Sequence, residues 1–155
     1  MRNRNAKTTH RILFLCTGNY YRSRYAEIYF NDRAAKLGLC WRAESRGLGL
    51  NECNKGPISR YTLERTESLG MPMEACRRMP AQVCEADFTA ADHIVAVKES
   101  EHLPLVEMNF PAWRDRVEYW HVHDIDCALP AASLPHLELE IDRLIERLAP
   151  QRMSA

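Results

Sequence analysis

Residues 11–23 read RILFLCTGNYYRS, and this stretch joins an apolar run to turn residues and then to the start of a periodic segment. The run that ends at Cys16 is typical of a fully buried strand in a parallel sheet. Thr17-Gly18-Asn19 has the composition of a turn. From Ser23 to Leu37 apolar residues recur at helical spacing, and a glycine follows as a stop signal. We therefore expect a strand, a tight loop and a helix in this order.

The rest of the chain alternates between short apolar runs and amphipathic segments. Further strands are expected at residues 39–44, 93–97 and 117–122, and further helices at residues 59–69, 85–90, 100–107 and 134–148, the last one capped by Ser133. Four strands alternating with helices predict an α/β domain with a parallel sheet. Because ligands of such sheets bind beyond the carboxyl ends of the strands, we expect a site at the loop after Cys16.

The composition indicates one ordinary domain. The 155 residues contain 21 Lys plus Arg against 21 Asp plus Glu, so the charge gives no support to a nucleic-acid partner. No apolar run approaches the roughly 18 residues that span a bilayer, and the apolar stretch after the basic N-terminus is too short for a signal peptide. We expect a flexible N-terminus at residues 1–10, one domain at residues 11–150, no membrane partner and a cytoplasmic location.

Six cysteines are present, and in a cytoplasmic protein they are expected to be reduced thiols. Only Cys16 has surroundings that indicate a role. The sequence assigns no role to the other five, which are Cys40, Cys53, Cys76, Cys84 and Cys127.

The loop after the first strand has the features of an anion cradle. Its backbone N–H groups point inward when the loop folds tightly, and the helix N-terminus adds a partial positive charge. Gly18 permits close approach, and Asn19 tolerates a left-handed conformation. The guanidinium of Arg22 has the fork geometry that matches two oxygens of a tetrahedral anion.

A thiol in such a cradle becomes a nucleophile. Its pKa is expected to fall from about 8.5 to roughly 3.5–7.5, as for thiols at helix N-termini and near cations. A hydrogen bond from the Ser23 hydroxyl favours the thiolate further, so Cys16 is expected to attack phosphorus while the loop holds the other oxygens. The alternative is a buried strand-end cysteine with Arg22 on the helix surface. We favour the interpretation of Cys16 as a nucleophile, because the sequence places glycine, asparagine, arginine and serine in order between a strand and a helix.

The residues Cys16-Thr-Gly-Asn-Tyr-Tyr-Arg22-Ser23, with Ala26-Glu27 after them, resemble the low-molecular-weight protein tyrosine phosphatases, whose signature is C-x-G-N-x-x-R-S between a strand and a helix. The resemblance extends over nearly the whole chain in element order and is motif-specific at the loop. It implies a single domain with a four-stranded parallel sheet and helices on both faces, of the phosphotyrosine protein phosphatase I-like type. It also implies a phosphomonoester hydrolase that acts through a phosphocysteine, without a metal or cofactor, on a phosphorylated protein or a small phosphomonoester. Phosphate or sulfate is the expected site ligand.

The resemblance also implies a role for each site residue. Cys16 is the nucleophile, Arg22 is the phosphate clamp, Asn19 and Ser23 brace the loop and the thiolate, and Ser45 supports Asn19. A simple turn serine is the alternative for Ser45. The implied phosphate-binding residues are Thr17, Gly18, Asn19, Tyr20, Tyr21, Arg22 and Ser23.

The family also carries an aspartate that protonates the leaving group, between the fourth strand and the last helix. The segment 120–126 matches it, with Asp124 as the first candidate, Ile125 where the family has proline, and Asp126 as the second candidate. The alternative is that both are solvated loop acids.

The chain departs from the family pattern at several positions. Tyr21 replaces a second cysteine found in many members, and Arg24 replaces a proline and is expected to bring positive charge near the pocket mouth. The histidine that joins the asparagine network in the family falls near Ala75 or Cys76. Tyr20 and Tyr21 are either aromatic walls of the pocket or packed on the domain surface. Small phosphates, phosphotyrosine and phosphoarginine all remain open as substrates.

Three alternative functions each share some features with the sequence. A thiol-dependent arsenate reductase, by resemblance, needs two further cysteines between the third and fourth strands, and residues 97–117 contain none. A catalytically weak oxyanion- or phosphoprotein-binding module would use the cradle without the acid. His121, His123 and Cys127 have H-x-H-x3-C spacing, which is not a typical zinc pattern.

Overall fold

The apolar run that ends at Cys16 forms one of the two inner strands of the sheet in the computed structural model, which describes residues 8–149. The elements are β1 (His10–Cys16), α1 (Arg22–Leu37), β2 (Trp41–Gly47), α2 (Arg60–Ser68), η1 (Glu74–Cys76), α3 (Glu85–Ala90), β3 (His93–Ala96), α4 (Glu99–Asn109), η2 (Pro111–Arg116), β4 (Glu118–Tyr119) and α5 (Pro130–Leu148). Of the predicted flexible segment at residues 1–10, residues 1–7 lie outside the described part, and β1 already includes His10. The last residue of the predicted domain, 150, also lies outside it.

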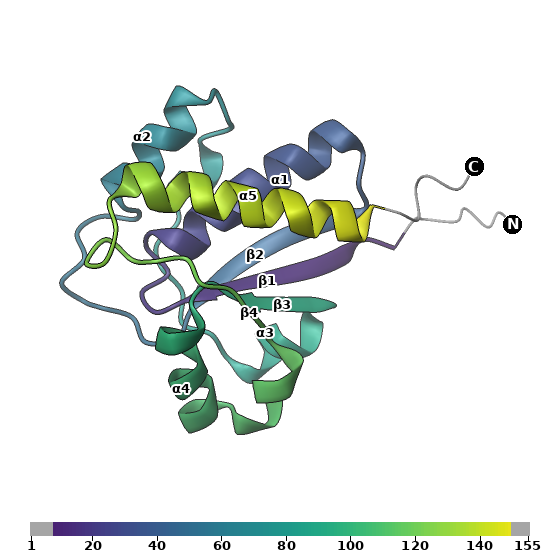
Figure 1. Ribbon diagram of the computed structural model, residues 1–155, viewed down its shortest axis with the longest axis vertical. Coiled ribbons are helices and arrows are strands. Elements are labelled where there is room, and N and C mark those ends of the chain that lie inside the picture. Colours follow the sequence, from purple (N-terminus) through teal and green to yellow (C-terminus); the bar gives the residue numbers. More distant parts are fainter. Residues whose placement is uncertain (1–7, 150–155) are drawn as a thin grey trace, which may run out of the picture.

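All four strands are parallel, in the order β2-β1-β3-β4. β1 pairs with β2 over its whole length, ending with Cys16 opposite Gly47, and with β3 from Ile12 to Leu15. Cys16 therefore ends a strand in the middle of the sheet, at the edge where the carboxyl ends of the strands meet (Figure 1). The predicted four-stranded parallel sheet is confirmed.

Helices cover both faces of the sheet, which explains why β1 is apolar without interruption. Phe14 and Cys16 lie in one buried cluster with residues of α1 and α5, whereas Leu13 and Leu15 lie in a second cluster with residues of α3, α4 and η2. Alternate residues of a strand point to opposite faces, so each face has its own core. Figure 1 shows α1, α2 and α5 on one side of the strands and α3 and α4 on the other. Among the described residues, no helix is long and apolar enough to cross a membrane.

The second strand differs from its prediction at both ends. It runs over Trp41–Gly47, so it begins two residues later than expected and includes the polar residues Ser45 and Arg46. Pairing with β1 overrides their weak local preference for a strand. Gly47 fits this place because a Cβ atom there would lie 2.7 Å from the backbone oxygen of Thr17. The end of β2 therefore packs directly against the loop after Cys16.

The segment before the last helix also differs from its prediction. The expected strand at residues 117–122 is reduced to β4, but the amides of Trp120 and Val122 still donate to the last carbonyl of β3 and to the one after it, at 2.9 and 2.8 Å. α5 begins at Pro130, so the prediction that Ser133 caps this helix is wrong, and Ser133 is buried within the first turn. Proline suits the first helical position because its missing N–H would have no partner there.

Candidate active site

The Cys16 sulfur lies at the carboxyl end of β1, in the loop that leads into α1. The backbone of Asn19 is left-handed, with φ of 48°, and its N–H donates to Cys16 Sγ at 3.2 Å. Ser23 Oγ lies 2.8 Å from the same sulfur. Because Ser23 Oγ already accepts from Asn19 Nδ2 at 2.9 Å, its own hydrogen is free to point at the sulfur. Two hydrogen-bond donors therefore surround the sulfur.

Arg22 is buried beside this sulfur, with 2% of its surface exposed. Its Nη1 donates to the Val122 carbonyl at 3.0 Å, and its Nη2 donates to both carboxylate oxygens of Glu101 at 3.0 and 2.8 Å. Asp124 Oδ2 lies 3.5 Å from Nη2. Burial acts to lower the pKa of Arg22, but the Cys16 sulfur and the two carboxylates outweigh it and raise the pKa above its usual value. The alternative of a surface arginine is therefore wrong, and the guanidinium stays charged.

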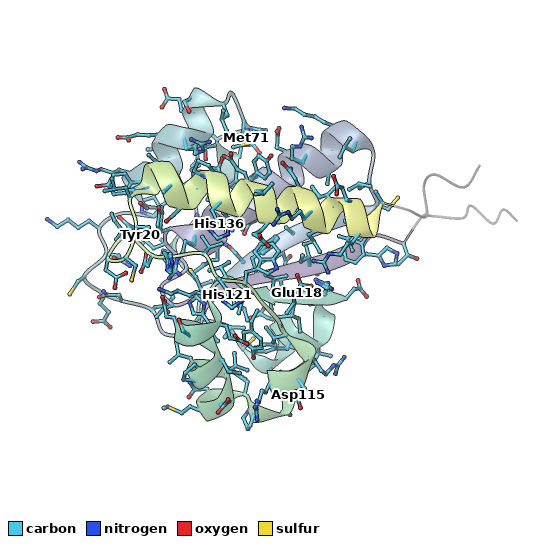
Figure 2. The ribbon with its side chains drawn as sticks, in the orientation of Figure 1. Tyr20, Met71, Asp115, Glu118, His121 and His136 are labelled. Carbon is cyan, nitrogen blue, oxygen red and sulfur yellow. The ribbon has the colours of Figure 1, made fainter. Side chains whose placement is uncertain are left out.

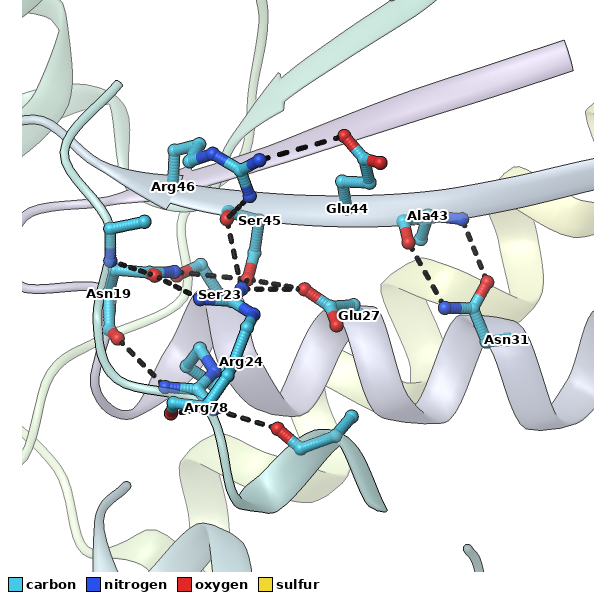
Figure 3. Close-up of polar contacts among 12 residues, drawn as sticks. Asn19, Ser23, Arg24, Glu27, Asn31, Ala43, Glu44, Ser45, Arg46 and Arg78 are labelled. Carbon is cyan, nitrogen blue, oxygen red and sulfur yellow. Dashed lines mark hydrogen bonds and ion pairs between the residues drawn. The ribbon is translucent and has the colours of Figure 1, made fainter. Parts of the chain in front are cut away.

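The side chain of Asn19 is fully paired, and this fixes its orientation (Figure 3). Its Nδ2 donates to Ser23 Oγ and, at 3.0 Å, to Ser45 Oγ. Its Oδ1 accepts from the Ala81 amide and from Arg78 Nη1, both at 3.0 Å. Ser45 is fully buried, so it is not a simple turn serine. The loop is therefore tied to β2 and to the segment after η1.

Arg78 is a functional candidate that the sequence did not reveal. Its Nη2 donates to Glu27 Oε1 and to Ser45 Oγ, each at 2.8 Å, in addition to the bond to Asn19 (Figure 3). The family's histidine position falls near Ala75 or Cys76, where this chain has no histidine, and Arg78 completes the network of Asn19 instead. Arg78 follows η1 in an irregular segment, where no periodic pattern distinguishes one arginine from its neighbours.

Arg24 contradicts its prediction. It is 1% exposed and donates to the carbonyls of Pro57, Ala75 and Arg78 at 2.8–2.9 Å. Burial, together with the nearby Arg78 guanidinium, lowers the pKa of Arg24 to about 10. Its positive charge does not reach the pocket mouth, because the three carbonyls enclose it. Arg24 instead links α1 to two irregular segments that pack behind the loop.

A cavity of about 290 Å³ opens above Cys16. Its lining residues are Cys16, Thr17, Gly18, Tyr20, Tyr21, Arg22, Asn51, Asn54, Ser59, Tyr61, Asp124 and Ile125. Figure 2 shows Tyr20 among the loops beyond the carboxyl ends of the strands. The asparagines at 51 and 54 belong to a loop whose sequence gave no sign of this position.

Two tyrosines of the loop form walls of this cavity. Tyr20 donates its hydroxyl to the Lys55 carbonyl, and Tyr21 packs edge-on against Tyr61 with ring centroids 6.4 Å apart. Tyr21 is 7% exposed, and burial, with the Asp124 carboxylate nearby, raises its pKa to about 12. Of the two interpretations of these tyrosines, the structure favours aromatic walls.

The two candidate acids occupy different places. Asp124 lines the cavity and is half-buried, and its Oδ1 accepts from the Ile125 amide at 2.9 Å. Asp126 is exposed and does not line the cavity. Asp124, not Asp126, therefore shares the cavity with Cys16. His121, His123 and Cys127 do not form a metal-ligand cluster, since the described residues contain no group of three His, Cys, Asp or Glu side chains suited to a metal ion.

Comparison with known proteins agrees with this geometry. The family model described as low molecular weight phosphotyrosine protein phosphatase matches residues 11–130. The chain is 33% identical over 87 residues to the low molecular weight protein-tyrosine-phosphatase YfkJ of Bacillus subtilis (strain 168), which covers 56% of this chain and 54% of that protein. It is 28% identical over 106 residues to a protein-arginine-phosphatase of the same organism, covering 68% of this chain and 67% of that protein. The alignment thus spans about half the length of the first of these relatives.

A solved structure is similar over more of the chain. The low molecular weight protein tyrosine phosphatase from T. tengcongensis is 26% identical, with a TM-score of 0.77, and the match covers 90% of this chain and 99% of that chain. The family match spans β1 from its second residue, the three other strands and the whole Cys16 loop, and it ends at the first residue of α5. Sequence motif, sheet order and family match agree, and the chain belongs to the low molecular weight phosphotyrosine protein phosphatase family.

Proposed function

We propose that the protein is a phosphomonoester hydrolase of the protein tyrosine phosphatase type, with Cys16 as the nucleophile. The observation that carries this proposal is the position of one sulfur. Cys16 Sγ faces a cavity, accepts from the Asn19 amide, contacts Ser23 Oγ and lies beside the buried guanidinium of Arg22. A tetrahedral dianion in this cavity meets both the nucleophile and a fixed cation.

In the first step the Cys16 thiolate attacks phosphorus, and the bond from phosphorus to the leaving oxygen breaks. The loop amides and Arg22 hold the three other oxygens, because the first N–H groups of α1 have no partner within the helix. After its bonds to Val122 and Glu101, Arg22 retains its Nε–H for the anion. Asp124 gives its proton to the leaving oxygen.

In the second step water attacks the phosphorus of the phosphocysteine. Asp124, now a carboxylate, takes a proton from this water, the bond from sulfur to phosphorus breaks, and Cys16 leaves as a thiolate. Ser23 and Asn19 stabilise that leaving thiolate through the contacts described above. Inorganic phosphate is the product, and phosphate or sulfate is the expected site ligand.

The proposed substrates are phosphorylated side chains of proteins or small phosphomonoesters. The two curated relatives are named as a tyrosine phosphatase and an arginine phosphatase, and both substrates carry a phosphoryl group on a flat, delocalised group. Tyr20, Tyr21 and Tyr61 give this cavity aromatic walls that suit such a group. The cytoplasmic location also remains a prediction.

Hydrolysis of an aryl phosphate at pH 5–7 tests the proposal, since Asp124 must be protonated in the first step. We expect turnover by the wild type and by the matched control Cys84→Ser, whose thiol is exposed and outside the cavity, and none by Cys16→Ser. Release of phosphate by Cys16→Ser at the wild-type rate would contradict the proposal.

A second candidate is a binding module without turnover. The exposure of Asp124, 37% of its side chain, and Ile125 in place of the family's proline favour it. This candidate predicts phosphate binding by a wild-type protein that hydrolyses no aryl phosphate.

A further inference from the structure

A carboxylate outside the signature loop holds the Arg22 guanidinium. Glu101 lies in the first turn of α4, and α4 packs on the opposite face of the sheet from α1. Glu101 therefore reaches around the carboxyl edge of the sheet to contact a residue of α1. Its two oxygens accept from Arg22 Nη2, and Oε2 also accepts from the Thr17 hydroxyl. One carboxylate thus fixes two residues of the anion-binding loop.

A buried histidine stands behind this carboxylate. His102 is fully buried, and its Nδ1 accepts from the Lys98 amide at 3.0 Å, which puts the proton of the neutral ring on Nε2. Nε2 lies 3.0 Å from Glu101 Oε2, though not aligned for a hydrogen bond, and has no aligned partner among the described residues. Burial lowers the pKa of His102, so the ring stays neutral. The ring therefore lies against the carboxylate without adding a charge.

The contacts decide the ionisation of Glu101. Burial raises its pKa, but the His102 ring, the Thr17 hydroxyl and the Arg22 guanidinium outweigh burial and hold the pKa well below its usual range. Glu101 is therefore an anion across the working pH of the site. Together with the Val122 carbonyl on Nη1, it determines which edge of the Arg22 guanidinium is left for a ligand.

We propose that Glu101 is a positioning residue of this active site, which orients Arg22 and Thr17 toward the bound phosphoryl group, with the neutral ring of His102 lying behind it. The proposal rests on the proposed function. Glu101 does not touch the substrate, and it acts by preventing rotation of the guanidinium away from the anion. A glutamine keeps the shape but has one acceptor oxygen, and its amide donors face the donors of Arg22 and Thr17.

A double-mutant cycle with a matched control tests this role. Glu101→Gln is expected to lower kcat/KM for an aryl phosphate by about 10- to 100-fold in the presence of Arg22. In an Arg22→Lys background the same change is expected to lower kcat/KM by less than about threefold, because the guanidinium that Glu101 orients is absent. The control Glu99→Gln, an exposed residue of the same helical turn, is expected to leave turnover unchanged. Equal losses in the two backgrounds would overturn the proposal.

A spectroscopic readout keeps the test independent of turnover. Guanidinium N–H groups held by Glu101 and Val122 are expected to give slowly exchanging proton–nitrogen resonances that Arg22→Lys abolishes. These resonances should broaden in Glu101→Gln and persist in Glu99→Gln. If they persist in a folded Glu101→Gln, the positioning role is wrong. Glu101→Asp, which keeps the charge on a shorter arm, replaces Glu101→Gln if that variant does not fold. A wild type that shows these resonances but no turnover would contradict the proposed function and leave the positioning role standing.

Discussion

The two sides of the cavity differ in how the protein holds them. Residues 16–23 are mostly buried, and their polar side chains bond to β2, to α4 and to the segment after η1. Residues 123–129 are mostly exposed, and several of their hydrogen bonds are local, from the amides of Ile125, Cys127 and Ala128 to Asp124. Phosphate binding therefore depends on long-range hydrogen bonds, whereas protonation of the leaving group depends on a loop with few of them. The two functions should be separable by mutation.

The largest expected loss of activity comes from a substitution within the buried residues 16–23. Arg22→Lys replaces a fork by a point charge and is expected to lower kcat/KM about 100- to 1,000-fold, equally for good and poor leaving groups. Steady-state kinetics with two aryl phosphates of different leaving-group pKa measures this. The matched control Arg143→Lys changes an exposed arginine of α5 outside the cavity lining and should have no effect. A variant that keeps a tenth of the activity would show that the clamp is not needed.

A substitution within the exposed residues 123–129 should lower activity on poor leaving groups more than on good ones. Asp124→Asn is expected to lower kcat/KM, which reports the first step, about 100-fold for a poor leaving group, which needs a proton, and little for a good one. Asp126→Asn is the matched control, since Asp126 is exposed and outside the cavity. The same two substrates measure the effect. Equal losses on both would indicate a structural role for Asp124, and a loss in Asp126→Asn alone would move the acid to that residue.

The smallest expected effect concerns the support behind the loop. Arg78→Met leaves Asn19 Oδ1 and the Glu27 carboxylate with fewer partners, which should lower the free energy of unfolding by about 1–3 kcal/mol. Urea denaturation measures this, with Arg77→Met, an exposed neighbour, as the control. Equal stability of Arg78→Met and the wild type would show that the network does not stabilise the loop.

The elements and site residues that depend on neighbouring positions in the chain were predicted from the sequence. β1, the turn and α1 follow from adjacent residues, and α3 has the predicted bounds, 85–90. Cys16, Asn19, Arg22 and Ser23 lie within eight positions, so their proximity needs only a tight turn. The end of β2 was missed because pairing with β1, not local propensity, keeps Ser45 and Arg46 extended.

The supporting side chains could not be predicted in the same way. Glu101 is 79 positions from Arg22, and Arg78 is 59 positions from Asn19. Neither contact produces a periodic pattern in the sequence, because each depends on how distant segments pack together at the edge of the sheet. Arg24 was misplaced for the same reason, since the carbonyls that enclose it come from distant segments.

The covalent intermediate tests the central claim most directly. Asp124→Asn, mixed with an aryl phosphate of good leaving group and quenched in acid during turnover, is suited to accumulate it, because the second step lacks its base. Mass spectrometry of the peptides is expected to find one phosphoryl group on Cys16 and none in the double variant that also carries Cys16→Ser. Phosphate release with the Cys16 peptide unmodified, or with the phosphoryl group on another residue, would contradict the account.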